Sequence, residues 1–135
     1  MEKRFEEIDH TADVAIRVWG SDVAELFANA AYGMTCQLAD PDNVRPSIER
    51  EIAAQGEDLE MVLVEWLSEL LYLEERDGLL FTEFDIHEVT SRGVEALARG
   101  GPVETYQGHI KAVTFSELEI TETDRGFETT IVFDV

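Results

Sequence analysis

One segment constrains the fold more than any other, because apolar residues recur at helical spacing between residues 59 and 71. The spacing follows i, i+3, i+4 over successive turns. The residues of this stripe are Leu59, Val62, Leu63, Trp66, Leu67, Leu70 and Leu71. Asp58 or Glu57 can cap the start of the helix, and Asp77-Gly78 predicts its end. So wide a stripe must be buried. We therefore expect the helix to pack on a β-sheet, with Trp66 in the core.

A second helical pattern follows Gly20, which ends the preceding strand pattern. Ser21 is the expected N-cap, with Asp22 in the first turn, and the helix is expected to run to about Gln37. The apolar residues at helical spacing are Val23, Leu26, Phe27, Ala30, Ala31 and Met34. Residues 39–46, which include two prolines, are predicted to form a polar loop.

Most of the remaining sequence has the pattern of β-strands. Predicted strands cover residues 5–9, 14–19, 48–54, 79–89, 93–99, 110–121 and 127–135. Residues 100–102 and 124–126 are predicted turns, because glycine and proline or aspartate cluster there. Strands outnumber helices and do not alternate with them regularly. This order predicts an α+β two-layer sandwich, in which two helices pack on one face of a mainly antiparallel or mixed β-sheet.

Length and charge limit the domain organisation and the classes of partner that can be expected. With 135 residues the chain has a common size for one domain, and residues 1–135 are predicted to form one. Its formal charge of −20 repels phosphate backbones, so nonspecific nucleic acid binding is not expected. The charge suits a basic protein partner, divalent cations or a salty cytoplasm, or it serves solubility alone. The sequence has neither a signal peptide nor a membrane span, so a cytoplasmic protein without a membrane partner is expected.

Three segments have residues suited to chemistry. Asp9, His10 and Asp13 lie in one five-residue run between the first two predicted strands, where carboxylates could bind a hard cation. The same run is also typical of a turn with side chain–backbone hydrogen bonds. The terminal pair Asp134-Val135 joins a side-chain carboxylate to the α-carboxylate, or else is simply solvated. Lys111 could neutralise carboxylates, contact a phosphate or face solvent.

Common enzyme signatures are missing from the sequence. It has no Walker A loop, dinucleotide-binding fingerprint, nucleophile elbow or zinc spacing. The single cysteine, Cys36, lies in an apolar run without a basic neighbour, which favours a buried, inert thiol. His87 and His109 belong to no catalytic pattern.

Segments in order along the whole chain resemble the archease family. They are residues 5–13, which end in Asp-His-Thr-Ala-Asp, residues 19–20, 25–31 and 63–72, the Ile-Lys-Ala-Val-Thr-Phe run at 110–115, and residues 132–135. The resemblance implies a non-enzymatic activator of the RNA ligase RtcB. That ligase joins a 2′,3′-cyclic phosphate or 3′-phosphate end to a 5′-hydroxyl in tRNA splicing and RNA repair. Members of the family are understood to speed guanylylation of the ligase and to allow multiple turnovers.

The resemblance also implies the site. The ligands of a divalent metal ion (calcium, magnesium or manganese) would be Asp13, Asp134 and the carboxylate of Val135. Asp9 or His10 would support these ligands, and Lys111 would take part in activation.

Two other functions remain as alternatives. The first is a chaperone-like modulator of a tRNA-modifying enzyme such as a tRNA cytosine methyltransferase, which the same resemblance suggests. The second is a metal-dependent hydrolase built on Asp13, Asp134 and His10, which would release phosphate from nucleotide or RNA without a partner.

Overall fold

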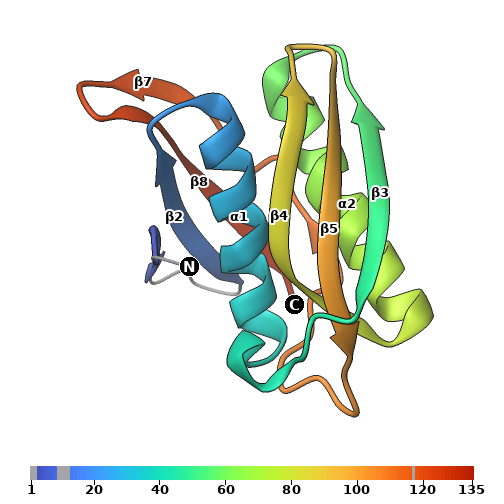
Figure 1. Cartoon of the computed structure of the whole chain (residues 1–135). Helices are drawn as coiled ribbons and strands as arrows, with labels where there is room; N and C mark the ends of the chain where they lie inside the picture. The colour runs from blue at the N-terminus through green and yellow to red at the C-terminus, as the bar shows by residue number, and fades with distance from the viewer. Residues whose placement is uncertain (1–2, 9–12, 117) are drawn as a thin grey trace.

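Helices and strands account for most of the chain (Figure 1). The structure is a computed structural model that describes residues 3–8, 13–116 and 118–135. Its elements are β1 (Phe5–Ile8), β2 (Val14–Gly20), α1 (Val23–Leu38), the 3₁₀-helix η1 (Pro41–Asn43), β3 (Ile48–Gln55), α2 (Leu59–Asp77), β4 (Leu79–Val89), β5 (Gly93–Pro102), β6 (Ala112–Val113), β7 (Thr121–Thr123) and β8 (Gly126–Asp134).

The strands form two antiparallel sheets. The five-stranded sheet has the order β1-β2-β8-β6, and β7 also pairs with β8. The three-stranded sheet has the order β3-β5-β4. Helix α1 contacts both β2 and β4, whereas α2 packs mainly against β3, β4 and β5. In Figure 1, α1 lies between the two sheets. The predicted α+β class with two helices on antiparallel sheet is confirmed, but the strands divide into two sheets where one was expected.

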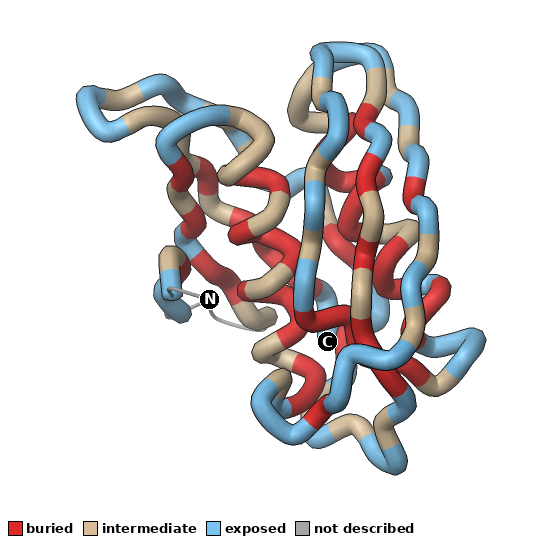
Figure 2. Tube along the Cα trace, in the orientation of Figure 1, coloured by how far each residue is buried: buried red, intermediate tan, exposed pale blue. Residues whose placement is uncertain are grey.

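Helix α2 carries the core stripe that the sequence predicts. Trp66 is fully buried, and its indole N–H donates to the carbonyl oxygen of Phe27 in α1 at 3.0 Å. The Trp66 ring also meets Phe84 of β4 edge to face, with 6.2 Å between centroids. Figure 2 shows that buried residues gather where the helices meet the sheets. One aromatic side chain thus joins both helices to the three-stranded sheet.

Both ends of α2 are capped as predicted. The Asp58 carboxylate accepts a hydrogen bond from the N–H of Met61 at 2.8 Å, which satisfies one of the free donors of the first turn. Gly78 ends the helix with φ of +66°, a left-handed conformation that glycine adopts without strain.

Replacing Asp58 by alanine is expected to lower the free energy of unfolding by about 1 kcal/mol, because the Met61 N–H loses its acceptor. Urea unfolding followed by circular dichroism measures the change. The matched control is Glu57→Ala, since among the described residues it is the Asp58 side chain, and not that of Glu57, that accepts from the first turn of α2. Equal losses in the two variants would contradict this cap assignment.

The N-cap of α1 is Asp22, so the prediction of Ser21 is wrong by one residue. The Asp22 carboxylate accepts from the N–H of Glu25 at 2.8 Å, and its backbone is extended. The Ser21 N–H instead donates to the Glu25 side chain at 3.3 Å. Asp22 thus satisfies a free donor of the first turn, and Glu25 reaches back to the N–H before the cap, in an arrangement similar to a capping box.

The strand predicted over residues 110–121 is mostly wrong. Only β6 and the first residue of β7 fall within it. After β6 the chain turns, and the N–H of Leu118 donates to the carbonyl oxygen of Phe115 at 3.1 Å. The N–H of Ile120 then donates to the Glu60 carboxylate in the first turn of α2, at 3.0 Å. A side chain of the helix therefore satisfies a backbone donor that a strand would have paired.

The turn predicted at residues 100–102 is also wrong, because these residues end β5. Gly100 lies against the backbone of Leu80, and a Cβ atom there would collide with the Leu80 carbonyl oxygen. The glycine therefore reports a close backbone approach within the sheet. The turn at residues 124–126 is confirmed: it joins β7 to β8, and Gly126 has φ of +121°.

Candidate functional site

The residues predicted as the metal site lie at one end of the five-stranded sheet. Val14 of β2 pairs with Phe133 of β8, so Asp13, which precedes β2, and Asp134, the last residue of β8, lie beside each other. On the other side of β8, the N–H of Lys111 donates to the carbonyl oxygen of Asp134 at 2.7 Å. The sheet register thus brings Asp13, Lys111 and Asp134 together from three distant parts of the chain.

This end of the sheet is open to solvent. Asp134 and Lys111 are exposed, Asp13 is half-buried, and 42% of the Val135 surface is accessible. Phe133 points into the core and is fully buried. Because successive side chains of a strand point to opposite faces, Asp134 points away from that core. The arrangement can offer carboxylate oxygens to a cation or a partner surface.

The donor chemistry of these residues suits a hard divalent cation, which prefers carboxylate and carbonyl oxygens. Within residues 3–8, 13–116 and 118–135, no three His, Cys, Asp or Glu side chains are grouped to hold a metal ion. The predicted set draws only two ligands, Asp13 and Asp134, from side chains, and its third is the α-carboxylate of Val135. Asp9 and His10 lie outside the described residues.

Cys36 is half-buried in α1, close to Tyr32. Burial is the main cause that raises the pKa of the Cys36 thiol, and it outweighs the opposing effect of Lys3. The thiol therefore stays protonated near neutral pH. This agrees with the sequence prediction of an unreactive cysteine, although the side chain is less buried than expected.

Glu74 is a buried acidic residue whose environment the sequence did not reveal. Its side chain is fully buried near the end of α2, where one carboxyl oxygen accepts from the N–H of Phe81 at 2.9 Å. The other carboxyl oxygen has no hydrogen-bond partner among the described residues. Burial is the main cause that raises the pKa of Glu74 to about 8, so the carboxyl is largely neutral at pH 7. Spacing of four residues from Leu70 could have marked the position as core.

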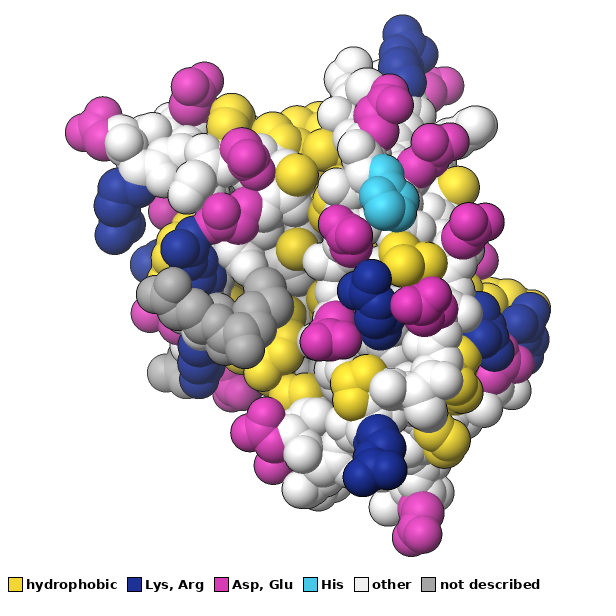
Figure 3. Space-filling view, viewed as in Figure 1, with side chains coloured by type: hydrophobic (Ala, Val, Ile, Leu, Met, Phe, Trp, Pro, Cys, Tyr) yellow, Lys and Arg dark blue, Asp and Glu magenta, His cyan; other side chains and the backbone are white. Residues whose placement is uncertain are grey.

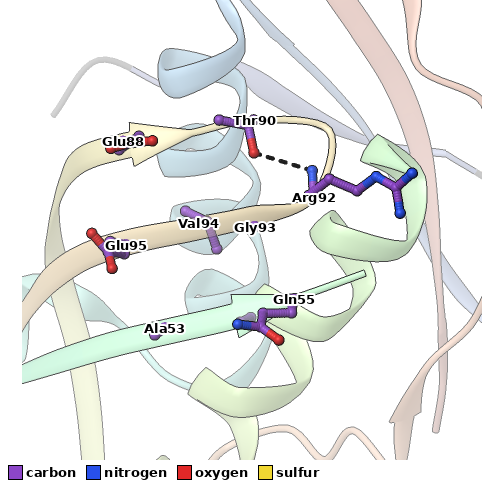
Figure 4. A pocket seen from close by; sticks show the side chains of 9 residues that line it. Ala53, Gln55, Glu88, Thr90, Arg92, Gly93, Val94 and Glu95 are labelled. Carbon is purple, nitrogen blue, oxygen red and sulfur yellow. Dashed lines mark hydrogen bonds between the residues drawn. The ribbon is translucent and has the colours of Figure 1, made fainter. Parts of the chain in front are cut away.

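A shallow depression of about 270 Å³ lies at the end of the β4–β5 hairpin (Figure 4). Glu88 of β4, Glu95 of β5 and Gln55 of β3 line the depression. Glu88 and Glu95 lie opposite each other in the strand pair. The N–H of Arg92 donates to the Thr90 hydroxyl oxygen at 3.1 Å in the hairpin turn. None of the predicted site residues lines this depression.

These features define a class of protein: a small α+β protein that presents acidic groups at exposed strand ends and over shallow depressions. In the part of the chain that the structure describes, no helix is long and apolar enough to cross a membrane. The chain belongs to the archease family, since the model of the Archease protein family (MTH1598/TM1083) matches residues 5–135.

Curated relatives match over almost their whole length. The chain is 37% identical to a protein archease of Methanosarcina mazei, over 98% of this chain and 97% of the relative. It is 36% identical to the protein archease of Archaeoglobus fulgidus, with both chains covered completely.

Solved structures share the fold. The solution structure of Methanobacterium thermoautotrophicum protein 1598 superposes with a TM-score of 0.85 at 29% identity, covering 99% of this chain and 100% of that one. A Thermotoga maritima archease, described as a possible chaperone, gives a TM-score of 0.65 at 21% identity with 96% of each chain covered. The second likeness concerns the fold alone.

Proposed function

We propose that this chain is a protein cofactor that activates an RtcB-type RNA ligase and has no turnover of its own. Membership of the archease family supports the proposal. The observation that carries it is the register that sets Asp13 beside Asp134, with Lys111 bonded to the Asp134 backbone. We place the functional site at this strand end, where it is open to a partner surface.

In this proposal Asp13, Asp134 and the α-carboxylate of Val135 hold a calcium, magnesium or manganese ion. Asp9 or His10 supports them. Carboxylates on directly opposed residues, about 5 Å apart, repel each other by up to about 3 kcal/mol at an effective dielectric of about 20. A bound cation would offset that repulsion and supply positive charge for phosphate oxygens.

The Lys111 side chain adds a positive charge to this strand end, and it is exposed. Its backbone bond to Asp134 fixes where the side chain starts. We propose that Lys111 and the carboxylate-held cation together orient the triphosphate of GTP for attack by the histidine of the ligase. The formal charge of −20 favours docking on a basic, RNA-binding ligase in the cytoplasm.

Formation of the ligase–GMP adduct tests the proposal directly. Adding the purified protein to an RtcB-type ligase with GTP and a divalent cation is expected to speed guanylylation of the ligase. The Lys111→Ala variant is expected to lose most of that increase, whereas Arg125→Ala, in the turn between β7 and β8, keeps it. An unchanged guanylylation rate with the wild-type protein would contradict the proposal.

A second candidate function is that of a chaperone-like modulator of a tRNA cytosine methyltransferase. Exposed Tyr72 and Phe115, each more than half accessible, could contact such a partner. A modulator of this kind needs a contact surface, so it would suppress methyltransferase aggregation equally well with Asp134→Asn. Light scattering of the heated methyltransferase separates the two functions.

A further inference from the structure

The outer edge of β3 is an open strand edge. β3 pairs with β5 on one side, and no strand among the described residues pairs with it on the other. Figure 1 shows β3 at the rim of the three-stranded sheet, with α2 beneath it. An edge of this kind presents backbone N–H and C=O groups that can pair with another chain.

Two hydrogen bonds at the hairpin end fix which backbone groups face outward. The N–H of Gly56 donates to the carbonyl oxygen of Arg92 at 3.1 Å, and the N–H of Thr90 donates to the carbonyl oxygen of Gly93 at 2.8 Å. In an antiparallel pair, alternate residues turn their backbone groups toward the partner. In β3 the even-numbered residues therefore bond to β5. The residues with outward backbone groups are Glu49, Glu51, Ala53 and Gln55.

Only the half of this edge around Glu49 and Arg50 is protected against pairing with another strand. The Arg50 guanidinium donates to the carbonyl oxygen of Glu49 at 3.1 Å and lies 3.8 Å from the Asp77 carboxylate. A positive charge held there blocks an approaching strand. Residues 51–55 contain neither proline nor a charge on the inner face. They leave room for an extended segment of about five residues.

The exposed face of the three-stranded sheet beside residues 51–55 is strongly acidic. Asp85 and Glu51 flank Leu97, while Glu88 lies opposite Glu95. None of these four carboxylates has an ion-pair partner in the described part of the chain. Figure 3 shows Asp and Glu side chains spread over this face, and Figure 4 shows Glu88 and Glu95 close together. Like charges directly opposite each other are unfavourable, so a positive side chain placed between them would be stabilised.

We infer that residues 51–55 of β3 bind an extended segment of a partner protein, which joins the three-stranded sheet and sets lysine or arginine side chains beside Glu51 and Glu95. Backbone hydrogen bonds supply the pairing, and the acidic face selects the positive charges. The inference goes beyond the proposed function, because it concerns the other sheet and uses none of the predicted metal-site residues.

A second copy of this chain is a poor occupant of the edge. Pairing β3 with β3 would bring the glutamates of one copy against those of the other. Each copy also carries a formal charge of −20. The charges of the edge therefore oppose self-association and favour a basic partner.

Amide hydrogen exchange measured by NMR tests the inference with a synthetic peptide of about nine residues, in which lysine alternates with threonine. In the free protein the amides of Glu51, Ala53 and Gln55 are expected to exchange quickly and those of Ile52 and Ala54 slowly. Saturating peptide is expected to slow the first three amides about tenfold or more. Slow exchange of these three amides without peptide would overturn the inference, since it would mean that the edge is already paired.

Two variants separate strand pairing from attraction by net charge. The double reversal E51K/E95K is expected to weaken peptide binding about tenfold or more. The control E122K/D124K, on the β7–β8 hairpin, changes the net charge equally and is expected to bind almost as the wild type does. Ala53→Pro removes the central outward N–H and should also weaken binding. Equal weakening by both double reversals, or full binding by Ala53→Pro, would overturn the inference.

Discussion

Replacing Glu74 by glutamine is expected to remove the loss of stability that this buried carboxyl causes as pH rises from about 4.5 to about 8. In the folded chain the buried carboxyl has a pKa raised to about 8, against an ordinary value of 4.5. Glutamine has the same shape, stays neutral at all pH values and can still accept from the N–H of Phe81. The variant therefore keeps the local hydrogen bond without the ionisation.

The direction in which stability changes with pH follows from the number of protons that the folded and unfolded states bind. Below pH 4.5 Glu74 is protonated in both states, so its contribution to stability is fully present. Between 4.5 and 8 the unfolded chain has released this proton while the folded chain retains it. Unfolding then releases a proton, and the free energy of unfolding falls as pH rises. The fall ends near pH 8, where the folded chain ionises as well. A shift of this size corresponds to a few kcal/mol.

Urea unfolding at pH 5 and at pH 8.5 checks this prediction. We expect the stability difference between Glu74→Gln and the wild type to grow by a few kcal/mol in favour of the variant at the higher pH. Glu75→Gln is the matched control, because it removes an exposed carboxylate from the adjacent position. If Glu74→Gln and Glu75→Gln showed the same pH dependence, Glu74 would not be a buried neutral acid.

Replacing Asp134 by asparagine is expected to weaken divalent cation binding about tenfold or more and to abolish most ligase activation. The substitution removes one negative charge and leaves the side-chain size almost unchanged. The Asp134 carbonyl oxygen would still accept from the N–H of Lys111, so the pairing of β8 should persist. Asp13→Asn is expected to have a similar effect, because this residue lies beside Asp134 across the strand pair.

Titration calorimetry with calcium, magnesium and manganese measures the change in binding. Asp124→Asn is the matched control, since it removes the same charge from the turn at the other end of β8. Equal affinity of Asp134→Asn and the wild type for every cation would contradict the assignment of Asp134 as a ligand.

The elements that the sequence predicts best are those whose signal is local. The stripe on α2 and its cap at Asp58 depend on residues within a few positions of one another, and both are confirmed. Residues 110–121 have strand-like composition, but pairing requires a partner of matching length. β8 pairs with β6 over only two residues, and Glu60 of α2 takes over a later backbone donor. Such a partner is distant in sequence, so composition could not reveal it.

The candidate site shows the same contrast between local signals and contacts that are distant in sequence. Residue types marked Asp13 and Asp134 as possible ligands, but no local pattern sets the two side by side. Their proximity follows from the pairing of Val14 with Phe133, which are 119 positions apart. The acidic edge of β3 was missed for a related reason. The sequence predicted a strand over residues 48–54, whereas its open edge follows from the order of strands in the sheet.

Ligated RNA formed per molecule of RtcB-type ligase is the most direct test that the carboxylates at this strand end serve activation. The wild-type protein and Asp124→Asn are both predicted to carry the ligase through several turnovers, while Asp134→Asn leaves it near a single turnover. Several turnovers with Asp134→Asn, equal to those with the wild type, would contradict the account.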